Sequence, residues 1–185
     1  AVDSYIGLVL GRGCPNYPPH KVQPYGPSNK RKHGCDWIVS DPTGNAFVEC
    51  KGKRLLRDSR TLEDNEALER DLDTLAQAVV QNYRNIADAE AGLADWVPNQ
   101  LPTFSLVVTL DDWVLFSRRP QDQLHDMVLR KAEAADLTPM LARIPYFCVS
   151  AADTEELAMA WGKAGIAHVM KNKANDEHRR WMMSP

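Results

Sequence analysis

The sequence has no long apolar run and no large excess of charge of one sign. The apolar stretch at residues 5–10 is far shorter than the roughly 18 residues of a membrane-spanning helix, and no charged leader precedes it. The 22 basic and 25 acidic residues leave a net charge of −3, so the chain is not a polycation that would bind nucleic acid indiscriminately. We expect a soluble cytoplasmic protein that does not attach to a membrane.

Cysteine and histidine patterns that hold metals or disulfides are also missing. The four cysteines, Cys14, Cys35, Cys50 and Cys148, include no CxxC pair, and the five histidines show no ligand spacing. These absences argue against a zinc ribbon and a disulfide scaffold. We expect reduced thiols.

The charge that is present is distributed unevenly. Residues 21–60 hold nine lysines and arginines against four acids, which gives this stretch a local charge of +5. Such a basic patch can bind a polyanion although the whole chain is slightly acidic.

The first half of the chain predicts strands followed by one long helix. Residues 14–33 hold five of the twelve prolines, which excludes a helix there and leaves one short extended stretch at 22–25. Strands are predicted at 36–40 and 46–51. A helix is predicted at 63–90, because apolar residues recur there at spacings of three and four.

The second half predicts alternating strands and helices. Residues 103–110 are typical of a strand buried on both faces. The elements expected after it are a strand at 113–116, a helix at 121–135, a strand at 146–149 and a helix capped by Asp153 or Thr154, with Glu155 and Glu156 in its first turn. This order predicts an α/β fold with a mixed central β-sheet flanked by helices.

The segment between the first two predicted strands defines a hairpin. Asp41-Pro42-Thr43-Gly44 has the composition of a type I turn, with Asp first, Pro second and Gly fourth. If Asp41 and Gly44 face each other, the antiparallel register places Asp36 directly opposite Glu49, with their Cβ atoms about 5 Å apart.

The same register sorts the neighbouring side chains between the two faces of the hairpin. Lys51 projects from the face of Glu49, whereas Cys35 and Cys50 turn to the other face. A bulge beside the turn would change this parity.

Two interpretations of the paired acids are open. Asp36 and Glu49 repel each other unless a cation or proton lies between them, which favours a divalent-metal site. The alternative is a surface hairpin on which these acids and Lys51 form solvated ion pairs. The apolar residues beside them favour central strands, where unpaired carboxylates would be costly.

The arrangement of these residues resembles the PD-(D/E)XK nuclease superfamily. Asp36 begins one strand, twelve residues follow, and Glu49-Cys50-Lys51 lies on the next strand before a long helix. The resemblance covers residues 1–110 and implies a restriction-endonuclease-like fold. Cys35 stands where the family often has the proline that gives the motif its name.

The resemblance implies a catalytic set and a metal. Asp36, Glu49 and Lys51 would be catalytic, and Mg²⁺, or Mn²⁺ in its place, would be held by Asp36, Glu49 and the backbone carbonyl of Cys50. Asp3, on a predicted first helix at 3–10, occupies the place where the family more often has another acid. Lys51 would orient the attacking water or stabilise developing negative charge.

Further residues are implied around this set. The helix after the lysine strand often supplies a polar residue in this family, and Gln77 or Gln81 could fill that role. Lys53, Arg54 and Arg57 could contact flanking phosphates, or could form a solvated edge instead.

The sequence therefore predicts a metal-dependent nuclease that acts on DNA, in defence or repair. The alternative is a catalytically idle module of the same fold that binds nucleic acid or a partner protein. We expect a nuclease core at residues 1–118 and a C-terminal α/β extension at 119–185 packed on the same domain. Because the chain starts at Ala1, at the edge of a helix and without Met, we expect a domain of a longer protein, with the rest of that chain or a second copy as its partner.

Overall fold

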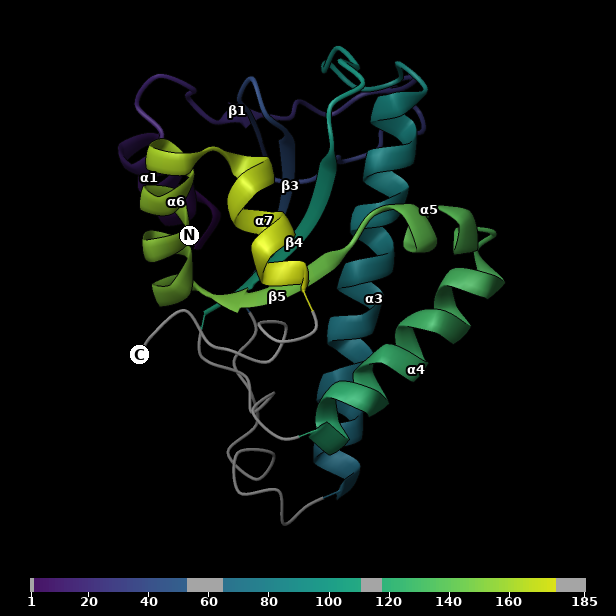
Figure 1. Ribbon diagram of the computed structural model, residues 1–185. Helices are drawn as coiled ribbons and strands as arrows, with labels where there is room; N and C mark the ends of the chain where they lie inside the picture. The colour runs from purple at the N-terminus through teal and green to yellow at the C-terminus, as the bar shows by residue number, and fades with distance from the viewer. Residues whose placement is uncertain (1, 53–64, 111–117, 176–185) are drawn as a thin grey trace.

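The computed structural model describes residues 2–52, 65–110 and 118–175 (Figure 1). Its centre is a five-stranded mixed sheet in which the strands follow the order of the chain. The strands are β1 (His20–Lys21), β2 (Trp37–Ser40), β3 (Asn45–Lys51), β4 (Thr103–Thr109) and β5 (Tyr146–Ser150). Strands β1, β2 and β3 pair antiparallel, and β3, β4 and β5 pair parallel. The prediction of an α/β fold with a mixed sheet is confirmed.

Helices cover both faces of the sheet. They are α1 (Val2–Gly13), α3 (Asn65–Glu90), α4 (Arg118–Ala134), α5 (Thr138–Arg143), α6 (Ala151–Ala164) and α7 (Ile166–Ala174). In Figure 1, α3, α4 and α5 lie to the right of the sheet, α1 and α6 lie to its left, and the yellow helix α7 lies in front of its strands. None of the described helices is long and apolar enough to cross a membrane.

Side-chain alternation on the central strands divides the interior into two cores. Phe47 and Val107 pack in the core between the sheet and α3, which we call the α3-side core. Val48, Leu106 and Val108 pack in the core between the sheet and α6, the α6-side core. Strand β4 is thus buried on both faces, as its apolar sequence predicts.

The hairpin has the register that its turn predicts. Trp37 pairs with Val48 and Ser40 with Asn45, and the backbone N–H of Asp41 donates to the carbonyl of Gly44 at 3.0 Å. No bulge interrupts these pairs. The alternation that places Glu49 and Lys51 on one face is therefore preserved.

The C-terminal part of the chain adds to the same sheet. Strand β5 pairs with β4, and α6 packs against α1 on the α6-side core. The predicted cap of α6 is wrong: the N-cap is Ser150, which forms a capping box with Asp153. Glu155 and Glu156 consequently lie beyond the first turn.

Several shorter elements differ from the predictions. The extended pair in the proline-rich stretch is β1 at His20–Lys21 rather than residues 22–25. The short helices α5 and α7 were not predicted. The predicted strand at 113–116 lies outside the described residues.

Candidate functional site

Glu49 and Lys51 lie on one face of β3 and form an ion pair. Nζ of Lys51 is 2.7 Å from Oε1 of Glu49. Glu49 is only 8% exposed. Burial raises the pKa of the Glu49 carboxyl, Lys51 opposes this shift, and the charge of Asp36 adds to it. The end of β3 therefore carries a carboxylate largely withdrawn from water, with one cation beside it.

Asp36 joins this pair from the neighbouring strand. It directly precedes β2, and its Oδ2 accepts a hydrogen bond of 2.7 Å from the backbone N–H of Cys50. Continuing the observed register by one residue beyond Trp37 places Asp36 opposite Glu49. The hairpin thus brings together the two acids and the lysine that the sequence predicts as a catalytic set.

The prediction that Cys35 and Cys50 share one face of the hairpin is wrong. Cys35 packs in the α3-side core, whereas Cys50 packs against the α6-side core. Strand β2 begins only at Trp37, so the alternation of a strand does not extend back to Cys35. The Sγ atom of Cys35 instead lies 3.5 Å from the carbonyl oxygen of Trp37. All four cysteines are free thiols.

The first turn of α1 lies beside the same end of the sheet. Trp37 donates through Nε1 to the carbonyl oxygen of Asp3 at 2.8 Å, and Nζ of Lys21 is 3.3 Å from Oδ2 of Asp3. Burial raises the pKa of the Cys50 thiol, and the two hairpin carboxylates and Asp3 add to this shift. Asp3 therefore lies beside Trp37 and near the Cys50 thiol, with Lys21 as its ion-pair partner.

Lys21 and Trp37 are site neighbours that the sequence did not identify. The ammonium of Lys21 lies 5.3 Å from the centroid of the Trp37 ring, within cation–π range. Gly7 permits this packing, because a Cβ at that position would overlap the Trp37 indole. Asp3 is 18 residues from Lys21 and 34 from Trp37, so no local spacing could have indicated these contacts.

The polar residue of α3 that reaches the sheet is Asn82. Its Nδ2 donates to the carbonyl of Phe47 and to Oγ of Ser105, both at 2.9 Å. Gln77 is exposed, and Gln81 donates to Asn85 at 3.1 Å on the helix itself. Neither predicted glutamine forms a hydrogen bond with the hairpin acids within the described part of the chain. The sequence could have indicated Asn82, because this polar residue lies among the apolar residues of the buried face of the helix.

Ion pairs with acids from elsewhere in the chain reduce the positive charge that residues 21–60 can present to a polyanion. Three of its lysines pair with acids: Lys21 with Asp3, Lys32 with Asp88 and Lys51 with Glu49. Two of these acids lie outside the stretch, so they lower the positive charge that it presents. The predicted phosphate contacts of Lys53, Arg54 and Arg57 lie outside the described residues and stay predictions.

The donor atoms at this site suit a hard divalent cation. Two carboxylates, from Asp36 and Glu49, and the backbone carbonyl of Cys50 are oxygen donors of the kind that Mg²⁺ and Mn²⁺ prefer. Among residues 2–52, 65–110 and 118–175, no group of three or more His, Cys, Asp or Glu side chains is placed to hold a metal. Mg²⁺ is commonly held by one or two carboxylates, with water and substrate phosphate completing its shell. Because a cation would also offset the repulsion that helps raise the pKa of Glu49, the residues present fit such an ion.

Comparisons with known proteins give no match for this arrangement. A scan against protein-family models finds no matching family, and no similar curated protein or solved structure is found. The function of the site must therefore be argued from its geometry.

Proposed function

We propose that this protein is a metal-dependent nuclease with a restriction-endonuclease-like fold, which hydrolyses phosphodiester bonds in DNA. The observation that carries the proposal is the buried Glu49 carboxylate at the end of a central strand, with Lys51 at 2.7 Å and Asp36 beside it. A buried acid whose pKa is raised by burial and by a second acid is a candidate for function rather than for stability.

The arrangement of the elements supports the proposal. An N-terminal helix, an antiparallel run from β1 to β3, the long helix α3 and the parallel strand β4 follow one another as the resemblance implies. The acids and the lysine lie directly before β2 and at the end of β3, and the backbone of Asp3 in α1 is bonded to Trp37 of β2.

Each residue has a separate role in this proposal. Asp36 and Glu49, with the carbonyl of Cys50, would hold the metal ion. When bound, the ion would polarise the phosphoryl oxygen and lower the pKa of its water. Lys51 would donate hydrogen bonds to negative charge that develops on the phosphate, which requires its ammonium to lie beside the acids as it does.

The test combines metal binding with cleavage. At Mn²⁺ about 100 times its Kd, the parent protein should gain about 2.7 kcal/mol and a few degrees or more in Tm. Asp36→Ala and Glu49→Ala should lose both this gain and cleavage of linear, circular and single-stranded DNA. Lys51→Ala should keep the Mn²⁺ response while cleavage falls by about 10²-fold.

Asp95→Asn is the matched control. Asp95 is an exposed acid whose ion-pair partner, His20 at 3.0 Å, has no role in the proposed site, so its replacement should change neither metal response nor cleavage. A structured RNA should be cut less well than DNA. If the parent protein cuts nothing and its Tm ignores Mn²⁺, the proposal is wrong and a catalytically idle binding module becomes the better account.

A further inference from the structure

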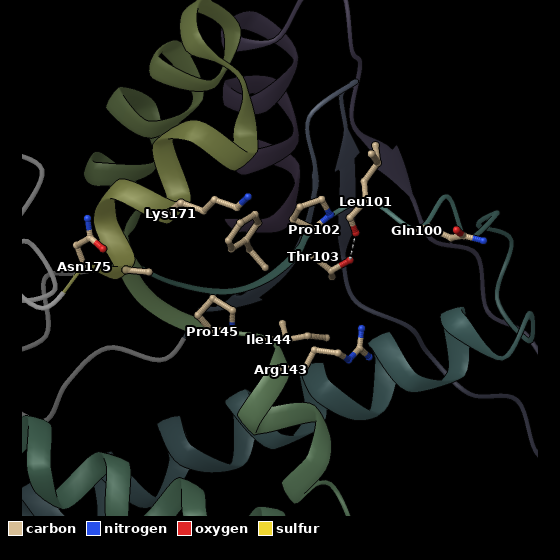
Figure 2. A pocket seen from close by; sticks show the side chains of 11 residues that line it. Gln100, Leu101, Pro102, Thr103, Arg143, Ile144, Pro145, Lys171 and Asn175 are labelled. Atoms are coloured by element: carbon tan, nitrogen blue, oxygen red, sulfur yellow. Dashed lines mark hydrogen bonds between the residues drawn. The ribbon is translucent and has the colours of Figure 1, made fainter.

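A pocket of about 570 Å³ opens where β4 and β5 begin (Figure 2). One wall consists of Lys171 in the last part of α7 and Asn175, which follows the helix. The other includes Pro102 and Pro145, which directly precede the two strands. Figure 2 shows the Lys171 side chain extending from α7 toward Pro102. This volume lies within the range of small-molecule sites in proteins.

The pocket is separate from the site at the end of β3. Phe104, which lines it, belongs to the α6-side core, whereas Glu49 projects from the face of β3 that packs on α3. Glu49 pairs with Val107, three residues further along β4, which is about 10 Å at the rise of a strand. A ligand here would lie at the other end of the sheet, where the strands β4 and β5 begin.

About half of the lining is apolar and half is polar. Phe104 and Ile144 form part of it and are 3% and 1% exposed, so their positions are fixed by the surrounding core. Pro102 and Pro145 have no backbone N–H to donate, and their carbonyls already accept hydrogen bonds from Asn45 and Ser105. This surface suits an apolar ligand body that makes few hydrogen bonds.

Among the described residues that line the pocket, one cation has no carboxylate to balance its charge. No aspartate or glutamate is among the described residues that line it, and two cations are. The two terminal nitrogens of the Arg143 guanidinium, Nη1 and Nη2, donate to the carboxylate of Glu90 at 3.0 and 2.7 Å. Lys171 is exposed, and no described carboxylate forms an ion pair with it.

We propose that this pocket binds a small organic monocarboxylate, whose apolar body lies against Pro102 and Pro145 while its carboxylate pairs with Lys171. Among the described residues, the ammonium of Lys171 is the cation of the lining without an ion-pair partner, and it balances one negative charge. A phosphate monoester would bring a charge of about −1.5 to −2 and leave part of it uncompensated, because Arg143 is already paired. The proposal does not depend on the nuclease function.

The test uses hydrocinnamate, an aromatic monocarboxylate, and its uncharged amide, hydrocinnamamide. In a titration followed by ¹H–¹⁵N correlation spectra, hydrocinnamate should shift the amides of Thr103, Phe104 and Lys171 with a Kd of about 1 mM or tighter. The amide should bind about tenfold more weakly, since it lacks the charge-assisted hydrogen bond. Phenyl phosphate should also bind more weakly than hydrocinnamate.

Variants of Lys171 identify the cation. Lys171→Met keeps the length of the side chain and should weaken hydrocinnamate about tenfold while leaving the affinity for the amide unchanged. Lys171→Arg should restore binding. Lys163→Met removes an exposed lysine of α6 that does not line the pocket, and should have no effect.

Three results would overturn the proposal. One is an absence of shifts at these amides up to about 10 mM hydrocinnamate. Another is equal affinity for the acid and the amide, which would show that the charge is not recognised. The third is a Lys171→Met variant that binds hydrocinnamate as the parent does.

Discussion

Asn82 allows a sharp test of how α3 holds the sheet beneath the candidate site. Its side chain is fully buried, and its Nδ2 bridges the carbonyl of Phe47 on β3 and Oγ of Ser105 on β4. Phe47 lies two residues before Glu49 on the same face of β3. Asn82→Ala removes this bridge and leaves two buried partners in place.

The cost of Asn82→Ala follows from the bonds that it breaks. Two hydrogen bonds contribute about 1 kcal/mol each, and the orphaned hydroxyl of Ser105 adds about 1 kcal/mol of desolvation. Part of this is offset because Oδ1 of Asn82 is itself buried without a hydrogen-bond partner among the described residues. We expect a loss of about 2–3 kcal/mol, which for a chain of 185 residues lowers Tm by about 4–12 °C.

The contribution of the hydrogen bond can be separated from a general packing effect by urea denaturation of four proteins. These are the parent, Asn82→Ala, Ser105→Ala and the double variant. The double-mutant cycle should give a coupling of about 1 kcal/mol, because both single changes break the same hydrogen bond. Asn172→Ala, an exposed asparagine of α7, is the control and should stay within about 0.5 kcal/mol of the parent. A coupling near zero, or Asn82→Ala as stable as Asn172→Ala, would refute the reasoning.

Three further substitutions test other parts of the structure. Burial raises the pKa of Glu49, so the folded state keeps this proton to higher pH than the unfolded state and the charged form weakens the fold. Glu49→Gln should therefore be more stable than the parent to urea at about pH 7, and this gain should disappear below about pH 4, where both states of the parent are protonated. Ser150→Ala removes the N-cap of α6 and should cost about 1 kcal/mol in thermal unfolding, whereas Ser150→Asp should retain most of the stability. Gly162→Ala places a Cβ against the carbonyl oxygen of Gly13, where α1 and α6 cross, and should cost at least about 2 kcal/mol; an unchanged Tm would contradict this close crossing.

The hairpin was predictable because neighbouring residues determine its geometry. The carboxylate of Asp41 accepts hydrogen bonds from the backbone N–H groups of Thr43 at 2.7 Å and Gly44 at 2.9 Å, which fixes the turn. Once the turn is fixed, strand alternation places Glu49 and Lys51 on one face. The four residues of the turn, 41–44, were thus sufficient to predict the register of both strands.

The neighbours of the hairpin were not predictable, because they depend on contacts between distant segments. Lys21 reaches Asp3 only after β1 has paired with β2, and Asn82 reaches Phe47 only after α3 has packed on the sheet. The cap of α6 was missed for another reason. Strand β5 ends at Ser150 and the helix begins at the next residue, so no loop residues mark the boundary.

The same long-range contacts explain how a hairpin can hold two acids in a fixed relation. At its turn, Oδ2 of Asp41 accepts a hydrogen bond of 2.7 Å from the backbone N–H of Ile166, which ties the turn to α7. At its open end, Trp37 donates to the carbonyl of Asp3 and ties β2 to α1. The carboxylate of Asp36 itself accepts a hydrogen bond from the backbone N–H of Cys50, which fixes it beside the residue that follows Glu49. Hydrogen bonds at both ends of the hairpin thus fix its position between α1 and α7, and the proposed cation site would use this preorganisation.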